Sequence, residues 1–343
     1  MSLVGRVGLY RLARQALFCL DAEQAHELTI QLLSSLPRMS GAMMGGHWSA
    51  PRTVMGIDFP NPVGLAAGLD KNAECIEAWH RLGFGFIEVG TVTPRPQPGN
   101  PKPRMFRLPE HEALINRLGF NNKGVDHLVE RVRESNYRGV LGINIGKNFD
   151  TPLASAQDDY LTCLRKVYEH ATYVTVNLSS PNTKGLRDLQ KGDALGALLT
   201  TLKSEQTRLA DDFGRYVPLV IKIAPDMDDA QLRVTADVLR SCEADGVIAT
   251  NTTISRSGVD GAAHGQEQGG MSGKPLAALS THAVQVLHKQ LAGELPIIGL
   301  GGITDHASAS EKIIAGADLL QIYTGFIYKG PMLIGECVKA ALQ

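Results

Sequence analysis

Short apolar runs recur along this chain between residues 63 and 323, and they alternate with stretches of helical character. Each run has four to six residues, is rich in β-branched side chains and is bounded by Gly, Pro or Asn, as is typical of buried parallel strands. The runs occupy residues 63–67, 86–90, 141–145, 173–178, 219–224, 247–250, 297–300 and 319–323. The fold must therefore bury eight strands of the same kind.

Amphipathic helices are predicted between these runs, at residues 73–82, 158–170, 193–210, 229–243, 279–291 and 307–315. Eight strands alternating with helices predict an α/β fold, a (β/α)8 TIM barrel, which occupies about 250 residues. An open Rossmann sheet would instead need Gly-x-Gly-x-x-Gly after an early strand. Here Gly299 and Gly301 follow the seventh run and Thr304 stands at the third glycine position, so the barrel is favoured.

Alternation within the runs predicts which side chains enter the barrel. In run 219–224 the aliphatic side chains share the face that should meet the helices, so Lys222 should point inward. The same parity places Asn144, Asn177 and Tyr323 on the inner face. Because barrel interiors are usually filled by branched apolar side chains, polar groups at the carboxyl ends of strands indicate a ligand at the barrel mouth.

Amide, hydroxyl and ammonium groups lie at or near the ends of several runs, and these are Lys71, Asn144, Asn177, Lys222, Thr250 and Asn251. Amides both donate and accept hydrogen bonds, so a ring of them suits a planar heterocycle such as a pyrimidine or a flavin. The two lysines add positive charge for a carboxylate or a developing anion. The alternative, that these residues only cap loops, weakens when six of them converge on one face.

Glycine-rich turns follow the last two runs. GLGGIT (299–304) and YTGF (323–326) can present backbone N–H groups where barrels commonly bind phosphate. Glu88, inside the second run, is expected to be a satisfied buried carboxylate rather than a catalytic one. No strand end carries His, Asp and Glu at metal-ligand spacing, so no metal site is predicted.

The overall composition excludes several classes of protein. The net charge is -1, from 34 basic and 35 acidic residues, so no basic footprint for nucleic acid is present. The five cysteines are scattered and odd in number, which fits neither a disulfide framework nor a zinc site and indicates a reducing compartment. The apolar stretches near the N-terminus reach only about five residues, far short of the roughly 20 that span a bilayer, and no signal peptide is recognised.

Two segments lie outside the repeat. Residues 1–50 contain two amphipathic helical patterns, with Asp21 expected to cap the second, and residues 51–343 are predicted to form the barrel. Residues 91–139 form a long, proline-rich insertion between the second and third strands. Long loops in compact domains are usually functional.

The loop NLSSPNTKGLRDL (177–189) is the most specific stretch, since it can reach over the barrel mouth with Arg187 and Asp188 available as anchors. With it, a set of ordered motifs from about residue 10 to residue 335 resembles dihydroorotate dehydrogenase of class 2, the membrane-associated, quinone-reducing class. The motifs are AAGLDK, EVGTVTPRPQPGNPKPR, INRLGFNN, LGINIGKN, NLSSPNT, VIKIAPD, IATNTT, GGMSGKPL, IIGLGGI and QIYTGFIYKGP.

The resemblance implies that FMN lies at the barrel mouth and that dihydroorotate stacks against it. The implied FMN contacts are Ala67, Gly68, Lys71, Thr91, Asn144, Asn177, Lys222 and Thr250, with backbone of Gly273, Gly302, Tyr323 and Thr324 at the phosphate. The implied dihydroorotate contacts are Lys71, Asn116, Arg117, Leu118, Gly119, Phe120, Asn177, Asn182, Asn251 and Thr252.

Ser180 matches the catalytic base of class 2, and the resemblance implies that it removes the C5 proton of dihydroorotate while hydride passes from C6 to flavin N5. Class 1 enzymes carry cysteine at this position and lack the N-terminal helices. A serine hydroxyl is a poor base unless a neighbour or a water chain takes its proton onward, and the sequence identifies no such relay. Lys222 is expected to stabilise negative charge near flavin N1 and O2.

In class 2 the N-terminal helices form an apolar tunnel from the membrane to the flavin. His26, Arg107 and Tyr323 match positions near the quinone, although His26 alone would otherwise be interpreted as a solvated helical histidine. The implied location is peripheral, on the cytoplasmic face of the inner membrane, and a monomer is compatible with the sequence. Deletion of residues 1–40 is expected to abolish quinone reduction and membrane association and to spare flavin reduction, provided that the barrel stays folded.

The implied activity is oxidation of dihydroorotate to orotate in de novo pyrimidine (UMP) biosynthesis. Two alternatives remain at this point. One is a class 1 type of activity that passes electrons to fumarate or to another protein, which Ser180 disfavours. The other is a catalytically silent barrel that binds a flavin or a phosphate ligand, which the presence of Lys71, Asn116 and Asn251 disfavours.

Overall fold

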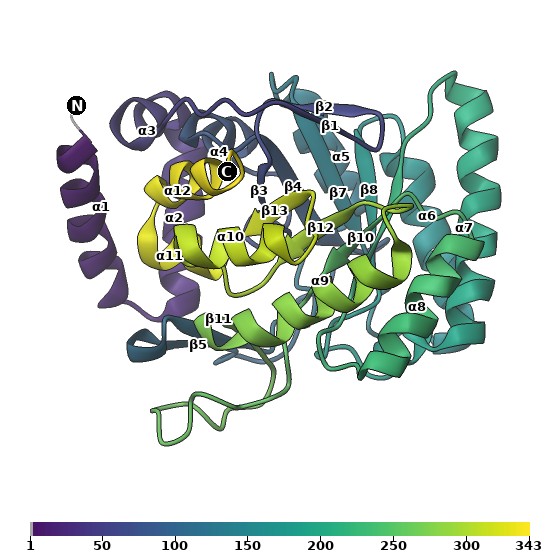
Figure 1. The fold of residues 1–343 in the computed structure, drawn as a ribbon. Helices are drawn as coiled ribbons and strands as arrows, with labels where there is room; N and C mark the ends of the chain where they lie inside the picture. Colours follow the sequence, from purple (N-terminus) through teal and green to yellow (C-terminus); the bar gives the residue numbers. More distant parts are fainter. Residues whose placement is uncertain (1–2) are drawn as a thin grey trace.

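Eight parallel strands form a closed barrel in the computed structural model, which describes residues 3–343 (Figure 1). In barrel order they are β3 (Val63–Leu65), β4 (Phe86–Val92), β7 (Val140–Ile145), β8 (Tyr173–Asn177), β9 (Leu219–Ile223), β10 (Gly246–Ala249), β12 (Ile297–Leu300) and β13 (Leu319–Ile322). Pairing of β13 with β3 closes the ring. All eight predicted strands and the TIM-barrel prediction are confirmed.

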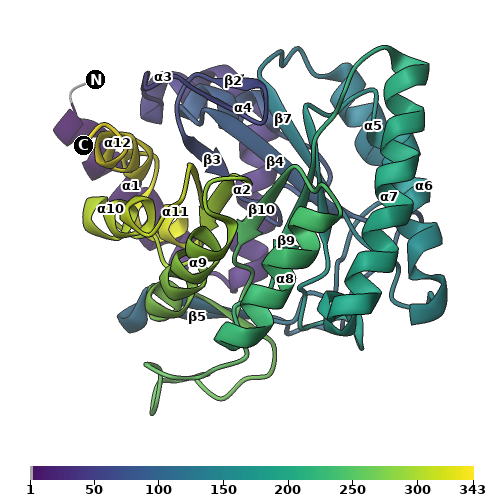
Figure 2. The same cartoon turned by 45° about the vertical axis from the view of Figure 1, so that its right-hand side comes forward.

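Helices cover the outside of the barrel, and all six predicted helices are confirmed (Figures 1 and 2). The helices of the barrel are α4 (Ile76–Leu82), α5 (Val125–Glu134), α6 (Ala156–Val167), α7 (Gly192–Phe213), α8 (Asp229–Ser241), α9 (Ala277–Leu291), α10 (His306–Ile314), α11 (Thr324–Lys329) and α12 (Met332–Ala340). Short 3-10 turns lie at Pro109–His111, Leu153–Ser155, Leu186–Gln190 and Lys274–Leu276. Helices α5, α11 and α12 were not predicted from the sequence.

The amino ends of the barrel strands are covered by a small antiparallel hairpin, β1 (Arg52–Val54) and β2 (Ile57–Phe59). Phe59 is buried and packs edge-on against Phe86, with their ring centroids 5.1 Å apart. This fills the amino end of the barrel with apolar contacts.

Glu88 forms a buried polar layer within the barrel. Its Oε1 accepts a hydrogen bond from Asn144 Nδ2 at 2.8 Å. Its Oε2 accepts hydrogen bonds from the Tyr173 hydroxyl, Thr175 Oγ1 and Gln321 Nε2 at 2.9, 3.1 and 2.7 Å. The predictions of inward parity and of a satisfied carboxylate are confirmed, because every donor comes from the inner face of another strand.

Three helices precede the barrel: α1 (Leu3–Phe18), α2 (Ala22–Ser35) and α3 (Pro37–Met44). Asp21 caps α2 as predicted, accepting from the backbone N–H groups of Glu23 and Gln24. Helix α1 lies beside the C-terminal helices, where the Tyr10 hydroxyl donates to the carbonyl of Ile327 at 2.7 Å (Figure 1). The two-helix prediction missed α3, whose first residue is a proline, which is favoured at that position.

The insertion between β4 and β7 is not an irregular loop. It contains β5 (Met105–Leu108) and β6 (Ala113–Asn116), and β6 also pairs with β11 (Gly270–Gly273), which follows β10 in the chain. The resulting three-stranded antiparallel sheet lies at the mouth end of the barrel (Figure 1). It brings Asn116, at the end of β6, opposite Gly270.

Replacing Glu88 by Gln should destabilise the barrel. The amide would present a donor to groups that themselves donate, so we expect the free energy of unfolding to fall by about 2 to 4 kcal/mol. Urea denaturation followed by fluorescence measures this loss. Glu336→Gln on the exposed side of α12 is the control and should change little; an equal stability of the two variants would contradict the role given to Glu88.

Candidate active site

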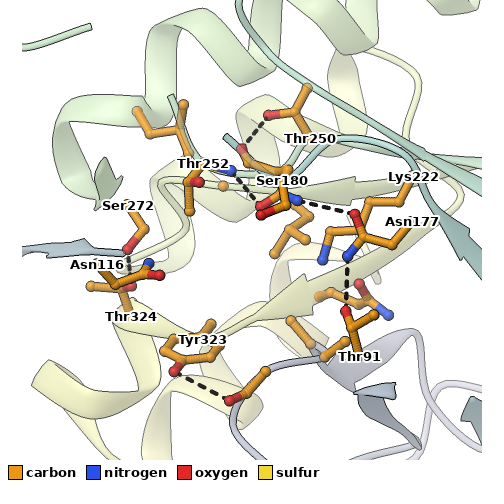
Figure 3. A pocket seen from close by; sticks show the side chains of 18 of the residues that line it. Thr91, Asn116, Asn177, Ser180, Lys222, Thr250, Thr252, Ser272, Tyr323 and Thr324 are labelled. Atoms are coloured by element: carbon orange, nitrogen blue, oxygen red, sulfur yellow. Dashed lines mark hydrogen bonds between the residues drawn. The ribbon is translucent and has the colours of Figure 1, made fainter. Parts of the chain in front are cut away.

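A cavity lies at the carboxyl ends of the barrel strands, between the barrel and the three-stranded sheet (Figure 3). Nearly all predicted mouth residues line it. They are Ala67, Gly68, Lys71, Thr91, Asn116, Leu118, Gly119, Phe120, Asn177, Ser180, Asn182, Lys222, Thr250, Asn251, Thr252, Gly273, Gly302, Tyr323 and Thr324. Residues from seven barrel strand ends and from the insertion therefore meet at one place.

Two of the predicted contacts, Asn144 and Arg117, lie elsewhere. Asn144 is fully buried one layer deeper, between Glu88 and the side chains that line the cavity. The Arg117 side chain turns away from the cavity, pairs with Glu267 at 2.7 Å and stacks over the Phe106 ring. The residue itself stays beside the site through its backbone, but its guanidinium does not reach the cavity.

The amides at the bottom of the cavity hold one another in fixed orientations. Asn177 Nδ2 donates to Thr91 Oγ1 at 2.9 Å (Figure 3). Thr91 Oγ1 donates in turn to Asn144 Oδ1 at 2.5 Å. Asn177 Oδ1 accepts from Ser179, and Asn251 Nδ2 donates to Ser179 Oγ at 2.9 Å. Because the amides are locked by these contacts, their orientation is set before any ligand arrives.

Two lysines line the cavity, and neither has an acceptor for its ammonium group among the described residues. Lys222 on β9 is opposite Asn177 on β8, and burial lowers its pKa while the charge of Glu88 opposes that shift. Burial lowers the pKa of Lys71 to about 8, and the carboxylate of Glu23 opposes the shift. Cations held in this way are prepared to bind an anionic group.

Glycines form the side of the cavity at the ends of β12 and β11. Gly302 has φ +76°, and a Cβ there would lie 2.2 Å from Ala277 Cα. Gly273 has φ +96°, and a Cβ there would lie 2.2 Å from the Glu112 carbonyl oxygen. Only glycine fits either position, so the backbone is bare where the family resemblance implies a phosphate.

The loop after β8 carries Ser180, whose Oγ accepts from the Asn182 backbone N–H at 3.2 Å. Arg187 anchors this loop, as predicted. It donates to the Ser179 carbonyl at 3.0 Å, pairs with Asp226 at 2.8 Å and donates to the Thr252 carbonyl at 3.0 Å. The prediction for Asp188 is wrong, because Asp188 pairs with the exposed Lys191 within the same segment.

A second cavity, of about 320 Å³, lies between the N-terminal helices and the barrel, and its lining is almost entirely apolar. All three residues predicted at the quinone line it, namely His26, Arg107 and Tyr323. Tyr323 lines both cavities and thus separates them. Burial, together with the charge of Lys71, lowers the pKa of His26 to about 3, so its imidazole is neutral at physiological pH.

The comparisons with known proteins agree with this geometry. A family model described as dihydroorotate dehydrogenase matches residues 49–342. The chain belongs to the dihydroorotate dehydrogenase family. Relatives named dihydroorotate dehydrogenase (quinone) from Ectopseudomonas mendocina and Azotobacter vinelandii are 60% and 61% identical over 334 residues, covering 97% of this chain and 98% and 96% of theirs.

Solved structures of the family share the fold of this chain. The crystal structure of ligand-free DHODH from Eimeria tenella superposes with a TM-score of 0.86 at 40% identity, covering 94% of each chain. The complex of the Eimeria tenella enzyme with ferulenol gives the same TM-score at 38% identity over 94% of this chain and 91% of that one. The resemblance to class 2 of the family is confirmed by the quinone-dependent relatives.

Some residues of this dihydroorotate dehydrogenase site were missed in the sequence. Ser272 lines the cavity and accepts from Thr324 Oγ1 at 2.8 Å, although it lies within the quoted motif GGMSGKPL. Asp70 is buried beside Lys71 and accepts from the backbone of Glu74 and from Trp79 Nε1, which fixes the turn that carries Lys71. Its position next to Lys71 in AAGLDK was the available signal.

Arg187→Met should loosen the Ser180 loop without unfolding the barrel. The substitution removes two contacts that join the loop to neighbouring segments, at Asp226 and Thr252, and one within the loop, at Ser179. We therefore expect amide hydrogen exchange in residues 179–187 to become about 10-fold faster or more. Mass spectrometry of exchanged peptides measures this. Lys191→Met, which removes a 76% exposed side chain whose partner is Asp188 in the same segment, is the matched control; indistinguishable exchange in the two variants would refute the anchoring role.

Proposed function

We propose that this protein oxidises dihydroorotate to orotate, with FMN as hydride acceptor and a membrane quinone as electron acceptor, in pyrimidine biosynthesis. The observation that carries the proposal is the arrangement of the two cavities. One is polar and contains Ser180 within a ring of amides; the other is apolar, and Tyr323 belongs to both. The names of the relatives support the same substrate and acceptor.

The residues of the mouth fit FMN. Gln321 Oε1, which lines the cavity, is buried without a hydrogen-bond partner, and Lys222 has no acceptor for its ammonium group among the described residues. A flavin ring with alternating N–H and C=O edges satisfies such groups, and the glycine side at Gly273 and Gly302 fits its phosphate. When bound, FMN supplies the acceptor for hydride and the carrier for two electrons.

The same cavity can recognise dihydroorotate. Asn116, Asn177, Asn182 and Asn251 offer donors and acceptors for the edges of the pyrimidine ring, and Lys71 offers a cation for its carboxylate. Asn182 Nδ2 contacts the Asn116 carbonyl at 3.2 Å, so the Ser180 loop and the insertion meet above the cavity. We infer that the substrate is enclosed between these two segments.

Ser180 is proposed as the base that accepts the C5 proton. Its side chain is buried, and its Oγ lies in the same cavity as the amide ring. Within residues 3–343 no carboxylate or imidazole is hydrogen-bonded to it, so the proton must leave through water or substrate contacts. Lys222 is proposed to stabilise negative charge that develops on the flavin ring, since it lines the same cavity as Ser180.

Residues 1–50 are proposed to form the quinone-binding segment, and residues 51–343 the FMN-binding barrel. The apolar cavity takes its walls from α1, α2 and α11, and a neutral His26 adds no charge to it. Arg107 stacks over the Phe18 ring at 4.6 Å and donates to the Leu20 carbonyl. The guanidinium of Arg107, a hydrogen-bond donor beside an apolar cavity, suits the carbonyl oxygen of a quinone.

Contact with a membrane surface is proposed for the first two helices. Leu12, Leu28 and Leu32 are exposed on α1 and α2, and Leu20 and Leu36 are exposed at the ends of these helices. No helix within residues 3–343 has the length and apolar character needed to cross a bilayer. Exposed leucines around the apolar cavity favour peripheral binding to a membrane. The resemblance to class 2 is the reason for proposing the cytoplasmic face of the inner membrane.

Ser180→Ala should leave FMN bound and slow flavin reduction by dihydroorotate. Loss of a positioned base costs about 10²- to 10⁴-fold in the rate of proton transfer, whereas the flavin contacts do not include the Ser180 hydroxyl. Anaerobic stopped-flow absorbance measures the rate, and the flavin spectrum of the purified variant reports FMN content. Reduction at the wild-type rate would remove Ser180 from this role.

The acceptor can be tested by comparing a long-chain quinone, fumarate and a nicotinamide cofactor with dihydroorotate as donor. Only the quinone should support rapid turnover, and Ala13→Phe, which fills part of the apolar cavity, should lower quinone kcat/KM about 10-fold while leaving flavin reduction unchanged. Ala16→Phe places the same ring on the exposed side of α1 and is the control. Preference for fumarate, or equal quinone kinetics in both variants, would contradict the proposal.

A further inference from the structure

A buried ion pair joins helix α2 to the insertion at the barrel mouth. Glu23 is 5% exposed and Arg104 is 7% exposed. Arg104 Nε lies 3.1 Å from both carboxylate oxygens of Glu23, and Arg104 Nη2 lies 2.7 Å from Oε1. The carboxylate therefore receives the guanidinium in a forked geometry, away from solvent, which is the stronger kind of ion pair.

Arg104 also gathers the segment that precedes it. Its Nη1 donates to the Pro98 carbonyl at 2.6 Å and to the Asn100 carbonyl at 2.8 Å. One side chain thus fixes the turn at residues 98–100 with one edge of its guanidinium while the other edge is held by Glu23. The turn is thereby linked to α2 through Arg104.

That turn supports the loop at residues 116–120 from behind. Asn100 Nδ2 donates to the Arg117 carbonyl at 2.8 Å, and the Asn100 backbone N–H donates to the Leu118 carbonyl at 3.1 Å. Gln97 Nε2 donates to the Gly119 carbonyl at 3.0 Å. Three successive carbonyls of this loop are therefore held by residues 97–100, and the opposite side of the loop lines the polar cavity.

Loss of the Glu23 charge would affect the loop at residues 116–120 through Arg104 and the turn at residues 98–100. A guanidinium left buried without its carboxylate is costly, so Arg104 would move toward solvent and release the carbonyls of Pro98 and Asn100. Glu23 also counteracts the desolvation of Lys71, whose pKa it raises against the effect of burial. Both consequences reach the polar cavity, because Lys71 and residues 116, 118, 119 and 120 line it.

We propose that Glu23 is a positioning residue for the reaction with dihydroorotate: through Arg104 it holds the loop at residues 116–120 against the substrate. This rests on the proposed function. It assigns to the N-terminal segment a part in the substrate half of the reaction, in addition to its walls around the apolar cavity. The expectation that deletion of residues 1–40 spares flavin reduction is therefore replaced by the opposite one.

Helix α2 offers a matched control one turn further on. Glu27 is 53% exposed and pairs with Lys102, which is 56% exposed, with 3.0 Å between Nζ and Oε1. Lys102 Nζ also lies 3.5 Å from Glu23 Oε1, so both variants weaken contacts of this exposed lysine and only Glu23→Gln removes the partner of Arg104. An exposed pair of this kind contributes about 0 to 1 kcal/mol. Glu27→Gln removes the same charge from the same helix without touching Arg104.

The experiment compares full-length Glu23→Gln and Glu27→Gln with the wild type. In Glu23→Gln we expect the Kd of orotate, read from the flavin spectrum, and the Kd of dihydroorotate in anaerobic flavin reduction to rise about 10-fold, which corresponds to about 1.4 kcal/mol. Reoxidation of the reduced enzyme by quinone should stay within about two-fold of wild type, and hydrogen exchange in residues 116–120 should accelerate. Glu27→Gln should match the wild type in all four readouts.

Unchanged orotate affinity and unchanged exchange in Glu23→Gln would overturn the proposal, as would an equal effect of Glu27→Gln or an equal loss in the quinone step. If Glu23→Gln does not fold with FMN, Arg104→Lys is measured instead. This variant keeps the positive charge but loses the hydrogen bonds to the Pro98 and Asn100 carbonyls. It must show weaker binding of orotate and dihydroorotate with unchanged reoxidation by quinone. Failure of wild-type enzyme to be reduced by dihydroorotate would refute the proposed function, whereas hydrogen exchange in residues 116–120 would still decide the role of Glu23.

Discussion

A continuous chain of hydrogen bonds runs from the inside of the barrel to its mouth, and the site depends on it. Glu88 accepts hydrogen bonds from four donors, one of which is Asn144. Asn144 accepts a hydrogen bond from Thr91, and both Thr91 and Asn144 accept one from the side-chain amide of Asn177. Buried polar groups that lack partners are costly, so each member of the chain fixes the next. The amides that face the cavity are therefore oriented by a carboxylate that never reaches it.

Groups left without partners mark what the site is built to receive. The ammonium groups of Lys71 and Lys222 have no acceptor among the described residues, and Gln321 Oε1 is buried and unpaired. A bound flavin and an anionic pyrimidine would supply the missing hydrogen-bond partners of these polar atoms. The side chains around Glu88 hydrogen-bond to one another and support the site, whereas the groups without partners face a ligand.

Periodicity was sufficient for the fold and for the site residues at the strand ends, because strand parity and strand ends are local properties, whereas the other site residues came from the family resemblance. It placed Lys222, Asn177 and Thr250 correctly, but it could not give the depth of a side chain within the barrel, and Asn144 lies one layer lower than expected. The pairing of β11 with β6 joins segments about 150 residues apart, and nothing local indicates it. Arg117 and Leu118 are neighbours in one motif, yet only the structure shows that the first side chain turns outward.

The Glu23–Arg104 pair shows why the limits of such prediction matter for function. The two residues are 81 positions apart, and each is surrounded in the sequence by other charges that prove to be exposed, such as Glu27 and Lys102. Burial alone distinguishes them, and burial is a property of the assembled fold. Helix α2 thus contributes His26 to the apolar cavity on one turn and Glu23 to the support of the polar cavity on the preceding turn. Any change in the position of this helix must act on both cavities, because neither contact can be moved without the other.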